Sequence, residues 1–140
     1  MIFLTPARCQ TLGEERLRTA GLSKQKASYV LDLARAFLAG DLERLQDISD
    51  AELRSKLLAI KGVGPWTVDM FAIFTLHRPD IFPTGDLGVR KGMQAHFGLK
   101  DLPTPSKMEQ LAEPWKPFRS VATWYMWQRA GTTLPAASKT

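Results

Sequence analysis

Two short segments of the sequence carry residues whose types and spacing could do chemistry. Residues 60–64 read IKGVG, with two glycines flanking a valine, and Gly85-Asp86 follows farther along the chain. Glycine permits positive φ and lets another backbone approach closely. Backbone amides at the start of a helix favour an anion such as phosphate. The second segment supplies a single carboxylate that could face a positive charge.

The glycine segment lies between two stretches with helical periodicity, and Pro65 suits the first turn of the second helix. Val63 could fill the apolar gap between the two helices. An ordinary tight turn is one interpretation of two such glycines. The extended pattern favours a helix-hairpin-helix motif that grips phosphates without reading sequence; its members are Leu57, Ile60, Gly62, Gly64 and Val68.

Asp86 also has two interpretations. An aspartate after glycine is most often the N-cap of a helix. The alternative is a catalytic carboxylate, because breaking an N-glycosidic bond builds positive charge on a sugar, and a fixed anion beside that sugar lowers the barrier. The carboxylate could also orient an attacking water.

The elements that must position these residues all have helical periodicity, which predicts an all-α fold of about six helices. Ser23 should cap a helix that ends at Gly40, and Asp86 a helix that ends at Gly98. The other expected helices are a short one through Leu53, Leu57 and Ile60, one from Pro65 to Arg78-Pro79 that includes Leu76, one around Met108, and one from about Arg119 to Ala130.

Composition limits the remaining possibilities. The 140 residues suffice for one domain, and the net charge of +5 favours a polyanionic partner. We expect no membrane span and no secretory signal. The single Cys9 excludes an internal disulfide, and His77 and His96 show no metal-binding spacing. We expect a monomer, and the sequence assigns no compartment.

The segments IKGVGPWTVDMFAIF, IFPTGDLGVRKGM and EPWKPFRSVATWYMWQRAG together resemble the helix-hairpin-helix superfamily of DNA glycosylases. Within it the chain is most similar to the 3-methyladenine DNA glycosylase II group, which acts on alkylated bases. The resemblance runs in order from about residue 3 to residue 131. It implies a helix-hairpin-helix glycosylase domain over residues 1–131, followed by a polar tail over residues 132–140.

The resemblance assigns roles to individual residues. It implies that Asp86 is the catalytic aspartate and that Trp66 and Trp127 line the base pocket. Bifunctional members carry a lysine at the position of Trp66, and a tryptophan cannot form a Schiff base, so we expect no abasic-site lyase activity. We expect Trp115 and Trp124 in the core, and Tyr125 is left open.

Further expectations concern DNA and cations. Phosphate contacts are expected from Gly62, Val63 and Gly64 and from the side chains of Lys61, Arg90 and Arg119, although a solvated face would explain any one of these basic residues. Asp69 is expected to be a surface or polar helix residue. No cofactor is required. The family often binds a monovalent cation through hairpin carbonyls, which match those of Leu58, Ile60 and Val63.

The resemblance also implies that the chain lacks the N-terminal part of the family's domain. Two functions therefore compete. The first is a monofunctional hydrolase that excises alkylated purines from double-stranded DNA in base excision repair, with the preferred lesion undetermined. The second is a non-enzymatic or inactive truncated helix-hairpin-helix module that only binds DNA. A helical protein-interaction domain is a weaker third.

Overall fold

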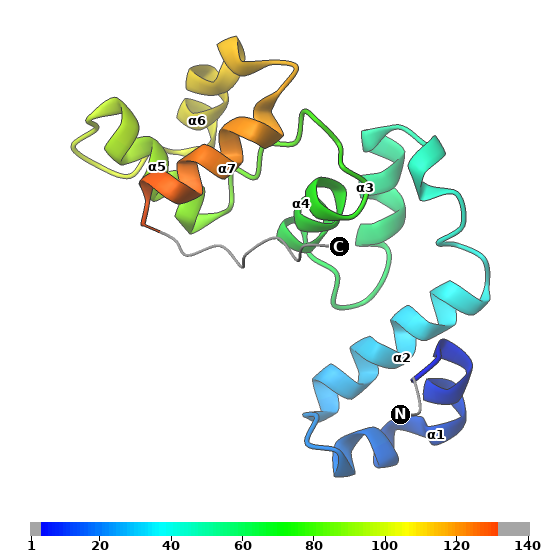
Figure 1. The fold of residues 1–140 in the computed structure, drawn as a ribbon. Helices are drawn as coiled ribbons and strands as arrows, with labels where there is room; N and C mark the ends of the chain where they lie inside the picture. The colour runs from blue at the N-terminus through cyan, green and yellow to red at the C-terminus, as the bar shows by residue number, and fades with distance from the viewer. Residues whose placement is uncertain (1–3, 132–140) are drawn as a thin grey trace, which may run out of the picture. The chain divides into compact units, whose positions relative to one another are not determined.

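The computed structural model describes residues 4–131, and every regular element in that range is helical (Figure 1). The predicted all-α fold is therefore confirmed for this part of the chain. The tail expected over residues 132–140 lies outside the described residues. The elements are α1 (Pro6–Thr19), α2 (Lys24–Leu38), η1 (Leu45–Asp47), α3 (Asp50–Leu58), α4 (Pro65–Phe74), α5 (Leu87–Phe97), α6 (Pro105–Ala112), η2 (Glu113–Trp115) and α7 (Arg119–Arg129).

Most helices begin where a polar residue can accept a hydrogen bond from the first turn. The Ser23 hydroxyl accepts from the amide of Lys26 at the start of α2. Ser49 and Glu52 form a reciprocal capping box at the start of α3. Asp86 caps α5, and Gly98 ends this helix with a φ of 62°. The starts predicted for α2, α4 and α5 are confirmed, as is the end of α5 at Gly98.

Three details differ from the predictions. Helix α3 ends at Leu58 and does not reach Ile60. Helix α1 was not expected, because its sequence has few apolar residues and contains Gly13, whose φ of 70° breaks the helical backbone. Helix α4 ends at Phe74 and does not extend to Arg78-Pro79. There the amide of Arg78 donates back to the carbonyl of Ala72, and His77 has a φ of 53°, so the chain turns out of the helix.

The chain divides into two compact units, residues 1–68 and 69–140, and the division falls within α4. In the described part of the first unit, α1 packs against α2. The buried apolar residues of this unit come from both helices and from the segments that follow them: Cys9, Leu17, Ala27, Ala34, Leu45, Leu53, Leu57, Ile60 and Val68.

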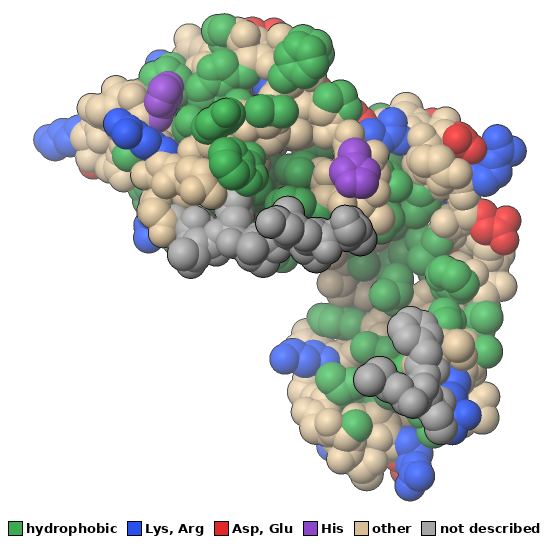
Figure 2. All heavy atoms as spheres, in the orientation of Figure 1, with side chains coloured by type: hydrophobic (Ala, Val, Ile, Leu, Met, Phe, Trp, Pro, Cys, Tyr) green, Lys and Arg blue, Asp and Glu red, His purple; other side chains and the backbone are tan. Residues whose placement is uncertain are grey.

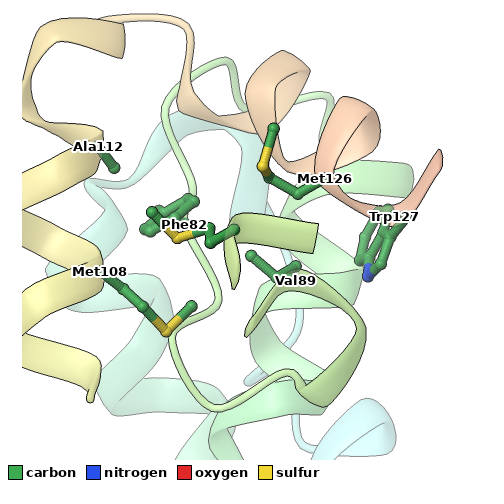
Figure 3. Close-up of a cluster of buried hydrophobic side chains, with 7 residues drawn as sticks. Phe82, Val89, Met108, Ala112, Met126 and Trp127 are labelled. Carbon is green, nitrogen blue, oxygen red and sulfur yellow. The ribbon is translucent and has the colours of Figure 1, made fainter. Parts of the chain in front are cut away.

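The second unit has a core built from α5, α6, α7 and the loop before α5 (Figure 3). Val89 and Met93 of α5 and Met108 of α6 are fully buried. Val89 and Met93 lie four residues apart within α5, which is the spacing of one helical face. The cluster contains Phe82, Val89, Met93, Met108, Ala112, Met126 and Trp127.

Helices α5 and α7 cross at very short range, and Gly92 makes this possible. A Cβ atom added at Gly92 would lie 2.0 Å from the backbone carbonyl oxygen of Met126. That distance is far inside van der Waals contact, and a backbone atom cannot swing away as a side chain can. Any side chain at position 92 would therefore push the two helices apart.

We predict that Gly92→Ala destabilises the fold. Alanine gains up to about 1 kcal/mol over glycine in a helix interior, but overpacking against a backbone typically costs about 1–3 kcal/mol or more. Urea unfolding should therefore show a lower midpoint for the variant. Gly85→Ala is the matched control, because a Cβ at Gly85 meets no described atom within 4 Å. Equal midpoints for the two variants would contradict the close crossing.

Candidate functional site

Asp86 is held by hydrogen bonds from two different helices. Its Oδ1 accepts from the amide of Val89 at 2.8 Å, which is the N-cap bond of α5. The same oxygen accepts from the indole Nε1 of Trp127, in α7, at 2.9 Å. Asp86 is half-buried. Asp86 is therefore an N-cap, as the first interpretation predicted. Its carboxylate also accepts a hydrogen bond from a residue 41 positions away, which an N-cap does not require.

Trp127 is fixed in the core of the second unit. Its side chain belongs to the buried cluster shown in Figure 3, and 5 % of the residue is exposed. Phe74 stacks on its ring with centroids 5.8 Å apart and planes inclined by 14°. Little of the ring is therefore left for a base to stack on, and the expected place of Trp127 in the base pocket stays a prediction. The geometry directs its N–H to Asp86.

Gly88 leaves the space that this hydrogen bond needs. A Cβ atom at Gly88 would lie 2.9 Å from Cδ1 and 3.3 Å from Nε1 of Trp127. It would also lie 3.1 Å from Oδ1 of Asp86. A side chain at this position would therefore press on both partners of the bond. The glycine thus gives the indole access to the start of α5.

The hairpin connects α3 to α4, as predicted. Its turn is closed by the amide of Val63, which donates to the carbonyl of Ile60, and α4 begins at Pro65. Gly62 has a φ of 87°, and a Cβ there would lie 2.3 Å from the ring of Tyr29. Gly64 does not adopt positive φ, and a Cβ there would meet no described atom within 4 Å.

The hairpin is attached to α2 by polar contacts through Lys61. The amide of Lys61 donates to Oδ2 of Asp32 at 2.8 Å, and its Nζ donates to the hydroxyl of Ser28 at 3.2 Å. The amide of Lys61, and then Arg35, hold the pKa of the Asp32 carboxyl below its ordinary value. Lys61 therefore helps to anchor the turn, whatever else its exposed side chain contacts.

Arg119 has a structural role in the second unit. Its guanidinium makes a two-point contact with the carboxylate of Asp80, at 2.7 and 2.9 Å, and a further contact with Glu109 at 3.0 Å. The side chain of Arg119 is 14 % exposed. The Arg119 hydrogen bonds lower the pKa of Asp80, and Asp80 raises that of Arg119. This geometry does not support the expected phosphate contact. Arg90 is half-buried, and its Nε donates to the carbonyl of Pro103.

The other aromatic and acidic residues divide by burial. Trp66 is 54 % exposed at the start of α4. Trp115 packs against the core as expected, but Trp124 is 45 % exposed and is not a core residue. Figure 2 shows hydrophobic side chains exposed on the surface over α7. In this part of the chain the exposed large apolar residues are Phe118, Val121, Trp124 and Tyr125. Asp69 lies within α4 and is 7 % exposed, so of the two expected alternatives it is a polar helix residue and not a surface residue.

The expected cation ligands are three backbone carbonyls of the hairpin region. The carbonyl of Ile60 accepts from Val63, and a carbonyl has a second lone pair that a cation could use. The cation therefore stays a prediction for Leu58, Ile60 and Val63. Within residues 4–131, no three His, Cys, Asp or Glu side chains gather as metal ligands would. None of the helices in this range combines the length and apolar character that a membrane span requires.

The structure thus defines two candidate sites, one in each unit. The hairpin, Lys61 and Trp66 belong to the first unit. In the second unit Trp127 comes together with Asp86 and Gly88, although 41 residues separate it from Asp86. Sequence reasoning missed Gly88 and Gly92. Their spacing of four residues places both on one helix face, but a pair of small residues shows no close partner until the fold is known.

Residues 1–117 match the model of the HhH-GPD superfamily of base excision DNA repair proteins. The chain belongs to this superfamily. The resemblance inferred from the sequence is therefore confirmed.

Within this superfamily, the chain is similar to glycosylases of alkylated bases. An alkylbase DNA glycosidase-like protein of Schizosaccharomyces pombe is 36% identical over 90% of this chain and 61% of its own length. A DNA-3-methyladenine glycosylase of the same organism is 35% identical, covering 90% and 57% of the two chains. The chain therefore spans about three fifths of these relatives.

Solved structures agree with the fold. The S. pombe 3-methyladenine DNA glycosylase in complex with abasic DNA superposes with a TM-score of 0.81 at 35% identity, covering 90% of this chain and 63% of that one. A DNA-3-methyladenine glycosidase from Bacillus halodurans gives a TM-score of 0.82 at 33% identity, covering 91% and 60%.

We predict that Gly64→Val weakens binding to every duplex alike while the protein stays folded. In the free protein, a side chain at position 64 would fit, because a Cβ there meets no described atom within 4 Å. In the DNA complex, the same side chain would block the approach of a phosphate to the backbone. Losing one phosphate contact should reduce the slope of log affinity against log salt by about 0.9. Fluorescence anisotropy with two unrelated duplexes at several salt concentrations measures both quantities.

Gly62 cannot serve the same purpose, because its positive φ and the Tyr29 ring make any substitution there a folding defect. Asp101→Asn, an exposed change in the second unit, is the neutral control for Gly64→Val. If Gly64→Val binds DNA as the unaltered chain does, the hairpin is only a turn between helices.

We predict that the Asp80–Arg119 pair makes stability depend on pH in the acid range. The folded-state pKa of Asp80 is lowered, so its contribution is fully present above the unfolded-state pKa of about 3.9 and is lost as pH falls through the folded-state value. Asp80→Asn should therefore be less stable than the unaltered chain at pH 5, and the gap should narrow toward pH 2. Thermal unfolding across this range tests it, and a constant gap would contradict the assignment.

Proposed function

We propose that this chain, through a domain spanning residues 1–131, removes alkylated purines from double-stranded DNA by hydrolysing the N-glycosidic bond. The reaction needs no cofactor in this scheme, and the protein acts as a monomer. The proposal rests on the superfamily to which the chain belongs and on the geometry of Asp86. The names of the relatives, which refer to alkylbase and 3-methyladenine glycosylases, support alkylated bases as the substrate class.

The observation that carries the proposal is the carboxylate of Asp86, held on one oxygen by donors from α5 and α7. As the bond between base and sugar breaks, the sugar gains positive charge. An anion already fixed in place stabilises that charge without reorganising during the reaction. The same carboxylate can orient the water that attacks the sugar. An N-cap requires the first hydrogen bond but not the second.

The hairpin supplies the grip on DNA in this proposal. The turn at residues 62–64 presents backbone at the start of α4, where the helix dipole favours phosphate. The contacts of Lys61 with α2 hold this turn in shape. Among the predicted basic contacts we retain Lys61 and Arg90 and omit Arg119, because two carboxylates already engage its guanidinium. Such contacts act on any sequence.

Trp66 is the aromatic residue that we propose for the damaged base. Its exposed ring can stack on a purine, and an alkylated purine that carries positive charge is attracted to a π-face. A damaged base also costs less to unstack and flip from the duplex. The same indole excludes lyase chemistry through a Schiff base at this position, which supports a monofunctional enzyme.

A DNA-binding module without activity is the second candidate. It is favoured by the placement of the hairpin in the first unit, which does not contain Asp86. A hairpin can grip phosphates without a complete catalytic cleft. Under this alternative the chain binds duplex DNA with strong salt dependence and releases no base.

We predict that Asp86→Asn abolishes most base release while DNA binding survives. Asparagine can still accept from Val89 and Trp127, so the cap and the fold should persist. Loss of a preorganised charge should lower the single-turnover rate on the order of a hundredfold or more. The measurement is release of methylated purines from alkylated duplex DNA, with anisotropy to follow binding.

Gly85→Asn is the matched control, because it introduces the same residue type next to Asp86 where there is open space. If Asp86→Asn excises bases at a rate close to that of the unaltered chain, Asp86 has no catalytic role. DNA binding without any base release by the unaltered chain would establish the second candidate. Strand cleavage with a borohydride-trapped intermediate would overturn the monofunctional assignment.

A further inference from the structure

The hydrogen bond between Trp127 and Asp86 is more than a way to satisfy a buried indole. A buried tryptophan needs one acceptor for its N–H, and backbone carbonyls commonly supply it. Here the acceptor is the carboxylate oxygen that also caps α5. Two donors from separate helices on one oxygen restrict both the position and the rotation of the carboxylate. A cap alone would leave that rotation much less constrained.

The indole itself cannot move to follow a displaced carboxylate. Phe74 stacks on its ring, the surrounding cluster buries it, and Gly88 and Gly92 set how closely α7 lies against α5. Rigid packing of this kind transmits small displacements directly. The position of the N–H is therefore determined by the core and not by the solvent-exposed surface.

We propose that Trp127 is a positioning residue for Asp86: its N–H, admitted by Gly88, holds the carboxylate in the orientation that stabilises the cationic sugar. This inference rests on the proposed function. It gives Trp127, which was expected to line the base pocket, a role that acts through Asp86. Because misplacement of a reacting group by about 1 Å can cost on the order of a hundredfold in rate, the hydrogen bond should matter to the chemical step and not to DNA binding.

The sharpest test replaces Trp127 with 3-benzothienylalanine, in which a sulfur atom takes the place of the indole N–H. Ring size and contact with Phe74 are retained, so the fold should be kept. The single-turnover rate of base release should fall about tenfold to a hundredfold, while the Kd for duplex DNA changes by less than about twofold. The same replacement at Trp124, an exposed residue of the same helix, should leave both quantities unchanged.

A second comparison separates positioning from general damage to the core. In a background carrying Asp86→Asn, the Trp127 replacement should cause no further loss, because orienting a neutral group has little electrostatic value. Gly88→Ala should reproduce the loss of rate by pressing on the indole. Loss of similar size in the charged and neutral backgrounds would overturn the proposal.

The contact itself can be checked without any activity. The indole 1H–15N resonance of Trp127 should shift and exchange faster with solvent in Asp86→Ala, and that of Trp124 should stay in place. If the unaltered chain releases no base, the proposed function is wrong. The positioning role of Trp127 is then wrong as well, although a shifted resonance would still show that the hydrogen bond exists. If the unaltered chain is active and the sulfur replacement is equally active, only the positioning role is overturned.

Discussion

The close crossing of α5 and α7 is the constraint on which the second unit depends. A Cβ atom at Gly92 would meet the backbone of Met126 at 2.0 Å, so the helices approach as far as two backbones allow. One turn earlier, Gly88 leaves room for the indole of Trp127. Glycine in a helix carries a conformational cost, and here the packing that it permits offsets that cost.

The catalytic proposal follows from this packing. An N-cap aspartate is common, and by itself it indicates only where a helix begins. At Asp86 the second donor comes from a residue fixed by the core. Preorganisation of this type is what makes an electrostatic contribution effective, since the charge need not be reoriented as the sugar becomes cationic. Stability and proposed activity therefore depend on the same contact between helices.

The basic residues near the motifs differ in what their side chains contact. Arg119 seemed suited to a phosphate, but its guanidinium contacts Asp80 and Glu109 and fixes the start of α7. Lys61 is different, because its backbone amide anchors the hairpin while its side chain stays on the surface. The contrast explains why basic residues near a motif cannot be sorted without their partners.

The sequence by itself determined the helical fold, the hairpin and the start of α5. Periodicity, proline and glycine positions, and capping residues act within a few residues, so they can be read locally. Helix α1 was not predicted from the sequence, because Gly13 interrupts it and few apolar residues mark its buried face. Only the tertiary structure showed the contact of Trp127 with Asp86, the burial of Asp69 and the exposure of Trp124. Each of these depends on which helices pack together and how closely, and no local pattern specifies that distance.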